Sequence, residues 1–108
     1  MSTEVENVGI DVVAQALARG ERIVDVRETF EYVDGHIAGA EHIPMHTVPL
    51  RLDELSGDGP VYVICASGNR SWQVASFLAR HGIHAYNVAG GMVAWQSLGH
   101  PITAGGTP

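Results

Sequence analysis

The stretch VYVICASGNRS, residues 61–71, decides the fold, because it joins an apolar segment to the clearest helical pattern in the chain. Its first five residues are mainly β-branched, which is typical of a buried parallel strand over residues 61–65. Behind the loop, apolar side chains recur from Val74 at the helical spacing of i, i+3 and i+4, and Gly82 suits the residue that closes a helix. The stretch therefore predicts a strand, a glycine-containing loop and a helix over residues 70–81.

Outside this stretch the chain alternates between further short strands and helical patterns. Strands are expected at residues 7–10, 23–26, 41–43 and 85–88. Helices are expected at residues 28–34, 48–55 and 92–98, and between a capping Asp11 and a terminating Gly20. Together these elements predict an α/β fold with a mainly parallel five-stranded sheet and helices on both faces. Ligands of such sheets bind beyond the carboxyl ends of the strands.

Length and composition favour one globular domain. The chain has 108 residues, of which 45% are hydrophobic and 17% are charged. This provides enough apolar material for a core and too little charge for a disordered protein. We therefore expect a single domain over residues 1–108, with its core at about residues 9–102 and a frayed tail of small residues at 104–108.

Charge and cysteine content exclude several classes of protein. Twelve Asp and Glu against six Arg, with no Lys, give a net charge of -6, which disfavours nucleic acids and anionic membranes as partners. The sequence shows neither a secretory leader nor an apolar run of the roughly 18 residues that cross a bilayer. Its single cysteine excludes an internal disulfide and suits a reducing compartment, so we expect a cytoplasmic protein.

The single cysteine, Cys65, lies where the predicted strand ends and the loop begins, which makes it the candidate nucleophile. Backbone N–H groups of a tight glycine-containing loop can point inward as an anion cradle, and the helix that follows adds the positive end of its dipole. This field and the Arg70 guanidinium favour the thiolate near neutral pH. The candidate ligand is an anion held by the loop residues Ala66, Ser67, Gly68, Asn69, Arg70 and Ser71.

The alternative for Cys65 is an inert thiol at a buried strand end, which is the commoner fate of a lone cysteine. A position between a strand and a glycine-containing loop with an arginine is much rarer. It also meets the electropositive condition for a reactive thiol, so we favour a reactive Cys65.

Three short motifs follow one another along the chain. The first is DVRE at 25–28, followed by EY at 31–32, GHIAGA at 35–40 and HIP at 42–44. The second is the loop CASGNRS at 65–71, and the third is Gly90-Gly91 with Trp95 shortly after. Each motif is weak alone, but together, in this order and spacing between about residues 9 and 102, they make a specific resemblance to single-domain members of the rhodanese (thiosulfate sulfurtransferase) family.

The resemblance implies a five-stranded parallel sheet, with the catalytic cysteine at the base of the loop, and no cofactor. It also implies a reaction in which the Cys65 thiolate attacks the outer sulfur of thiosulfate, releases sulfite and becomes a persulfide. The loop amides from Ala66 to Ser71 would stabilise this persulfide, and Arg70 would hold the sulfonate end of the anionic donor. Because there is no second cysteine to resolve the persulfide, the acceptor is external: cyanide, a small thiol or a protein thiol.

Two other functions fit the sequence less well. Related phosphatases and arsenate reductases carry one more loop residue, whereas four residues separate Cys65 from Arg70 and Ser71 stands where their arginine would. A smaller ring suits one sulfur better than a tetrahedral phosphate. The other alternative is a non-catalytic or weakly catalytic binding or regulatory module of the same family, and the intact Cys65 and Arg70 argue against it.

A group of charged residues beside the first motif is interpreted as structural. Asp25 and Arg27 lie at the carboxyl end of a predicted central strand, with Glu28 and Glu31 nearby. We expect them to form a partly buried network of ion pairs and hydrogen bonds that fixes the loops, outside the catalytic set.

The histidines do not predict a metal site. Pro44 separates His42 from His46 and prevents the continuous helix that would place both imidazoles on one face. His36 is expected to satisfy a hydrogen bond in a turn, because attack by an ionised thiol needs no general base.

The remaining motif residues are assigned to turns and packing. Gly90-Gly91 is interpreted as a tight turn near the active loop, and Trp95 as a packing residue. For Trp72, one residue after the loop, two interpretations stay open: it packs against the sheet, or it lines the pocket entrance.

Overall fold

The computed structural model describes residues 5–106, and its centre is a five-stranded sheet in which neighbouring strands run parallel. The strands are β1 (Glu6–Val8), β2 (Arg22–Asp25), β3 (Glu41–His42), β4 (Val61–Ile64) and β5 (Ala85–Val88). Their order across the sheet is β1-β5-β4-β2-β3, which places β4 in the middle. The predicted α/β fold with a parallel sheet is confirmed.

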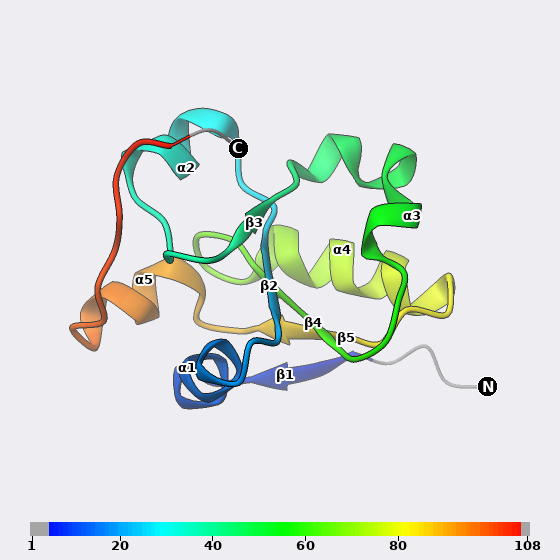
Figure 1. The fold of residues 1–108 in the computed structure, drawn as a ribbon, viewed down its shortest axis with the longest axis horizontal. Coiled ribbons are helices and arrows are strands. Elements are labelled where there is room, and N and C mark those ends of the chain that lie inside the picture. The colour runs from blue at the N-terminus through cyan, green and yellow to red at the C-terminus, as the bar shows by residue number, and fades with distance from the viewer. Residues whose placement is uncertain (1–4, 107–108) are drawn as a thin grey trace.

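Helices cover both faces of the sheet (Figure 1). They are α1 (Ile10–Ala18), α2 (Thr29–Asp34), the 3-10 helix η1 (Met45–Leu50), α3 (Leu52–Leu55), α4 (Asn69–Arg80) and α5 (Gly91–Ser97). Helices α1 and α5 pack on one face, while α4, η1 and α3 pack on the other. Within the described residues, no helix combines the length and the apolar character needed to cross a membrane.

The central strand β4 contributes to the core on both faces of the sheet. Val61 and Val63, with Cys65 just beyond them, belong to the apolar cluster beneath α4. Tyr62 and Ile64 belong to the cluster beneath α1 and α5. Successive side chains of a strand point to opposite faces, and Cys65 continues this alternation past the end of the strand. Its side chain therefore faces the same side of the sheet as α4.

The first helix differs from the prediction at its beginning. It starts at Ile10, with Gly9 as the N-cap residue, so the prediction of Asp11 as the cap is wrong. Ile10 is buried in the core beneath α1, and the N–H of Val13 bonds to the Gly9 carbonyl at 3.3 Å. Burial of Ile10 thus draws the helix start one residue toward the N-terminus and leaves Asp11 exposed in the first turn.

The prediction of one helix over residues 48–55 is also wrong. The chain instead forms the 3-10 helix η1 and, after Arg51, the single turn α3. Pro49 is the physical reason, because it has no amide hydrogen for an α-helical hydrogen bond. The short 3-10 segment brings Met45 and Val48 over the sheet, where both contact the core beneath α4.

The end of the described chain returns to α2. His36 and Thr103 exchange backbone hydrogen bonds of 2.9 and 2.8 Å in an isolated antiparallel bridge. The N–H of Gly105 donates to the carbonyl of Val33 at 2.6 Å, and Figure 1 shows this red segment running from α5 to α2. The tail predicted at residues 104–108 is described as far as Gly106, while positions 107–108 lie outside the described residues.

Candidate active site

The loop after β4 is held by close backbone contacts with the start of α5. The carbonyl of Cys65 accepts a hydrogen bond from Met92 N–H at 2.9 Å, and the carbonyl of Ala66 accepts one from Val93 N–H at 3.0 Å. Gly91 lies between these contacts with a φ of +58°, and a Cβ there would collide with the Ala66 carbonyl. Besides forming the predicted turn, the glycine at position 91 therefore lets α5 approach the loop closely, because it has no side chain.

The loop turns sharply at Gly68, so that its amides face the sulfur of Cys65. Gly68 has a φ of +105°, and a Cβ at this position would meet the Ala89 carbonyl. Its N–H donates to Cys65 Sγ at 3.1 Å, and Ser71 Oγ lies 3.3 Å from the same sulfur. The structure thus brings together Cys65 with two of the loop residues predicted to surround it.

This cradle favours the thiolate of Cys65. The side chain is 1% exposed, and burial by itself raises the pKa of the thiol. Hydrogen bonds from the Ser71 side chain and from the amides of Ser71, Gly68 and Ser67 outweigh burial and bring the pKa below its ordinary value. The expected thiolate character is therefore supported by the loop and its serine.

Asn87 on β5 is a buried polar residue that the sequence analysis did not identify. The Ser71 hydroxyl has one proton and two acceptors within reach, Asn87 Oδ1 at 2.6 Å and Cys65 Sγ at 3.3 Å, so it donates to Asn87 while Cys65 is a thiol and can turn to the sulfur when the thiolate forms. Asn87 Nδ2 donates to Asn7 Oδ1 at 2.9 Å and to the Gly68 carbonyl at 3.3 Å. Asn87 therefore fixes both groups that contact the sulfur, Ser71 and Gly68. The one signal for Asn87 in the sequence is its position as a polar residue in the otherwise apolar segment AYNV, residues 85–88.

Arg70 does not project freely into the site, because it is paired with Glu31 on α2. Its Nη1 and Nη2 atoms donate to the two carboxylate oxygens at 2.7 and 3.0 Å. The guanidinium lowers the pKa of the Glu31 carboxyl to about 2, and the same pair raises the pKa of Arg70. The sequence analysis placed Glu31 in a network with Asp25 and Arg27, so its pairing with Arg70 is a finding of the structure.

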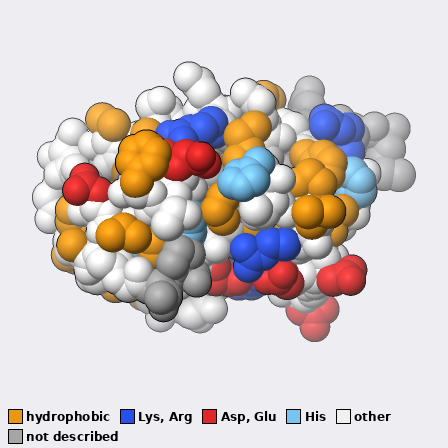
Figure 2. Space-filling view, turned by 90° about the horizontal axis from the view of Figure 1, so that it is seen from above, with side chains coloured by type: hydrophobic (Ala, Val, Ile, Leu, Met, Phe, Trp, Pro, Cys, Tyr) orange, Lys and Arg blue, Asp and Glu red, His pale blue; other side chains and the backbone are white. Residues whose placement is uncertain are grey.

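A cleft of about 710 Å³ opens beside the loop and is lined by Val26, Glu28, Met45, His46 and Arg70. We call it the mouth of the site. His46 Nδ1 lies 3.8 Å from Glu28 Oε2, so these two residues form a second ion pair at the mouth when the histidine is protonated. In the middle of the face shown in Figure 2, basic side chains lie directly beside acidic ones, with histidine and hydrophobic side chains next to them.

The expected ion pair of Asp25 and Arg27 is confirmed and is buried. Arg27 Nη2 donates to Asp25 Oδ2 at 2.7 Å and to the Gly35 carbonyl at 2.7 Å. This arrangement anchors the segment after α2 to the end of β2. Glu28 has a different task, because it caps α2 in a capping box with Glu31.

Histidines next to this pair fill structural positions. His36 Nδ1 lies 2.7 Å from the Tyr32 carbonyl, which gives the expected hydrogen bond, although His36 lies in the isolated bridge with Thr103 and not in a turn. His42 Nε2 lies 2.7 Å from the Arg27 carbonyl. Both rings stack on Tyr32, with centroids 3.7 and 4.5 Å away. No group of three or more possible metal ligands occurs within residues 5–106.

The two tryptophans occupy different environments. Trp95 is 3% exposed, packs in the core beneath α1 and α5 and donates its indole N–H to the Pro101 carbonyl at 2.8 Å, which confirms it as a packing residue. Trp72 is 42% exposed and lines a groove between η1 and α4. Neither interpretation open for Trp72 is confirmed, because its side chain is too exposed for a core residue and it is absent from the lining of the cleft beside the loop.

Comparison with known proteins identifies relatives over nearly the whole chain. Residues 10–98 match the family model described as the rhodanese-like domain. A protein named sulfurtransferase from Allochromatium vinosum is 36% identical over 103 residues, which are 93% of this chain and 96% of that protein. The thiosulfate sulfurtransferase GlpE of Pseudomonas aeruginosa is 30% identical over 107 residues, which are 98% of this chain and 97% of that protein.

Solved structures show the same fold. The crystal structure of a rhodanese-related protein from Thermoplasma volcanium superposes with a TM-score of 0.84 at 31% identity, over 91% of this chain and 97% of that one. The likeness includes the all-parallel sheet on which the Cys65 loop is mounted.

Proposed function

Because this chain belongs to the rhodanese-like domain family, we propose that it is a sulfurtransferase in which Cys65 carries a sulfur atom as a persulfide. The observation that carries this proposal is the cradle around Cys65 Sγ, formed by the Gly68 N–H at 3.1 Å and the Ser71 hydroxyl at 3.3 Å. Donors in this position stabilise negative charge on sulfur, both on the thiolate before the reaction and on the persulfide after it.

The first step takes sulfur from an anionic donor such as thiosulfate. The Cys65 thiolate attacks the outer sulfur of thiosulfate, the bond between the two thiosulfate sulfurs breaks, and sulfite leaves with the electron pair. The loop residues Ala66 to Ser71 surround the new persulfide. Arg70, at the mouth of the site, binds the sulfonate end of the donor in this proposal, through the N–H groups that it does not donate to Glu31.

The second step gives the sulfur to an external acceptor. The chain has one cysteine, so no second thiol can resolve the persulfide within it. A thiolate or cyanide attacks the outer sulfur of the persulfide, and Cys65 leaves as a thiolate, ready for another donor. A single cysteine that must stay reduced suits a reducing compartment, the cytoplasm.

Intact-protein mass spectrometry tests this cycle. The wild type is incubated with thiosulfate, measured, treated with cyanide and measured again, with Cys65→Ser as the matched control. We expect the wild type to gain the mass of one sulfur atom and to lose it again as thiocyanate forms, while the control shows no change.

A folded wild type that gains no sulfur from thiosulfate is next incubated with mercaptopyruvate and with a polysulfide. Loading by one of these changes the donor and keeps the mechanism. Absence of loading by all three contradicts the proposed sulfur transfer and favours a binding or regulatory module.

A further inference from the structure

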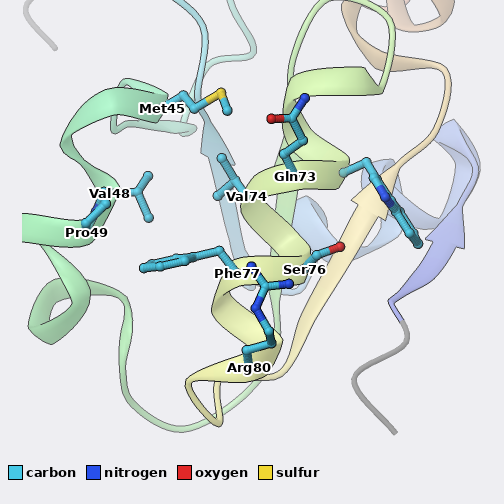
Figure 3. Close-up of a pocket in the computed structure, with 9 residues that line it drawn as sticks. Met45, Val48, Pro49, Gln73, Val74, Ser76, Phe77 and Arg80 are labelled. Atoms are coloured by element: carbon cyan, nitrogen blue, oxygen red, sulfur yellow. The ribbon is translucent and has the colours of Figure 1, made fainter.

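A groove of about 500 Å³ runs between η1 and α4, next to the candidate active site. Met45, Val48 and Pro49 line it from η1, and Val74, Phe77 and Arg80 line it from α4. Figure 3 shows Met45 and Val48 facing Val74 and Phe77 across this space. The walls are mainly apolar, and the volume lies in the range of pockets that hold small organic molecules.

The groove and the mouth of the site share a lining residue. Met45 lines both, which places the groove next to the mouth. Arg70 at the mouth is followed on α4 by Gln73, Phe77 and Arg80 in the groove. These spacings of three, four and three residues place all four on one face of the helix. With a rise of 1.5 Å per residue, Arg80 stands about 15 Å along the helix from Arg70.

Arg80 is also exceptional in its charge environment. Five of the six arginines form ion pairs: Arg19 with Glu21, Arg22 with Glu41, Arg27 with Asp25, Arg51 with Glu54, and Arg70 with Glu31. Among the residues that the structure describes, Arg80 has no carboxylate within ion-pair distance. It is exposed at the end of the groove, in a chain whose net charge is -6. A positive charge that has no carboxylate partner among residues 5–106, at the end of an apolar groove, fits a ligand with an anionic end.

We propose that this groove is the subsite for the sulfur acceptor, and that the acceptor it fits is a thiol with an apolar chain and an anionic end. The thiol lies at the mouth, the chain lies between η1 and α4, and the anionic end reaches Arg80. This inference rests on the proposed function, which it deepens by naming a class of acceptor. Its ligand is a small amphipathic thiol, because the groove has the volume of a small-molecule pocket.

The transfer step follows from this placement and needs no further reactant. The acceptor thiol gives its proton to solvent, and its thiolate attacks the outer sulfur of the Cys65 persulfide. A new S–S bond forms on the acceptor, the S–S bond to Cys65 breaks, and the electron pair returns to Cys65 as thiolate. The acceptor leaves as a persulfide, so sulfur moves between two thiols without net oxidation or reduction.

A series of synthetic thiols tests the subsite kinetically. The wild type is loaded with sulfur, and single-turnover transfer is measured to mercaptopropionate, mercaptoundecanoate and mercaptoundecanol. Mercaptoundecanoate spans about 14 Å from sulfur to carboxylate when extended, which matches the distance along α4. Each rate constant is divided by that of the same thiol with a small disulfide, which removes differences in intrinsic reactivity.

We expect both long thiols to react at least about tenfold faster than mercaptopropionate, because their methylenes are buried in the groove. Arg80→Gln should slow mercaptoundecanoate about threefold to fivefold, the effect of an exposed ion pair, and leave the other two thiols unchanged. Arg19→Gln is the matched control, because it removes the same charge from the end of α1 on the opposite face of the sheet. Equal rate constants for the long and short thiols, or equal effects of both variants, would overturn the proposal.

A binding measurement separates this inference from the proposed function. Undecanoate has no thiol, so its binding does not depend on sulfur transfer, and the exposed Trp72 in the groove reports it by fluorescence while Trp95 stays buried. We expect saturable binding that weakens in Arg80→Gln and persists in Cys65→Ser. Binding with no sulfur loading of Cys65 would overturn the acceptor role and the proposed function together. Normal transfer to cyanide with no undecanoate binding would overturn the subsite alone.

Discussion

Arg70 and Glu31 join α4 to α2 across the mouth of the site, through hydrogen bonds of 2.7 and 3.0 Å between guanidinium and carboxylate. The positive charge nearest the loop is therefore already offset by a negative one. On the proposed function, an anionic donor must either displace Glu31 or bind the N–H groups that Glu31 does not use. Glu31 thus controls how much of the arginine's charge the donor meets.

Glu31→Gln should lower the KM for thiosulfate about threefold to tenfold. The amide keeps the shape of the side chain and its place in the capping box, but it no longer neutralises Arg70, so the dianion meets a full positive charge. Steady-state kinetics with cyanide as acceptor measure this change. The salt dependence of KM should also become steeper. A raised KM would contradict this prediction. It would mean that Glu31 helps donor binding by holding Arg70 in position.

The same pair makes stability depend on pH. Glu31 has a pKa of about 2 in the folded protein and an ordinary value of 4.5, so its contribution is present above pH 4.5 and is lost as pH falls toward 2. Because the Arg70 side chain is 35% exposed, solvent screening reduces the contribution to about 1 kcal/mol. Urea unfolding of wild type and Glu31→Gln should differ by this amount at pH 7. The two curves should converge near pH 2, and a constant difference would refute the assignment.

Ser71→Ala should shift the reactivity of Cys65 toward higher pH. Hydrogen bonding to Ser71 helps to lower the pKa of the buried thiol, so its removal raises that pKa and reduces the thiolate fraction at neutral pH. The rate of alkylation by iodoacetamide, followed against pH, reports this directly, because Cys65 is the one cysteine of the chain. Ser97→Ala, at the exposed end of α5, is the control and should leave the profile unchanged. An unshifted profile in Ser71→Ala would assign the low pKa to the amides alone.

Gly91→Ala should both destabilise the fold and displace the loop that follows Cys65. The position combines a φ of +58° with a Cβ that meets the Ala66 carbonyl, and we expect a loss of at least about 2 kcal/mol. Gly99→Ala is a sharp control, because its φ of +80° is also left-handed but a Cβ there meets nothing within 4 Å. Its loss should be limited to the conformational cost of about 1 kcal/mol. Urea unfolding measures both, and equal losses would show that the contact with the loop does not matter.

The strand, loop and helix around Cys65 could be predicted because each leaves a local signal in the sequence. β-branched residues mark β4, Gly68 marks the turn, and apolar spacing marks α4, so the cysteine is placed correctly before any coordinates are known. The start of α1 depends on the packing of Ile10, and the boundaries of η1 depend on the missing N–H of Pro49. Local sequence patterns do not predict these boundaries accurately.

The partners of the loop could not be predicted in the same way. Glu31 stands 39 residues before Arg70, and Asn87 stands 16 residues after Ser71. Polar contacts between distant elements leave no periodic pattern, and Arg27 is a basic residue much nearer to Glu31 in the sequence than Arg70. The hydrogen bonds that Asn87 makes to Ser71 and Gly68 follow only from the order of β4 and β5 in the sheet.

The return of the chain to α2 has a practical consequence for handling this protein. Gly105 is bonded to the backbone of α2, the helix that carries Glu31, and Thr103 is bonded to His36 just after that helix. A purification tag fused immediately after Ile102, or a truncation at that point, would remove these ties and loosen α2, and with it the hold on Arg70. Kinetic constants measured on a shortened or closely tagged version would then report on a site in which Arg70 is held differently than in the 108-residue chain.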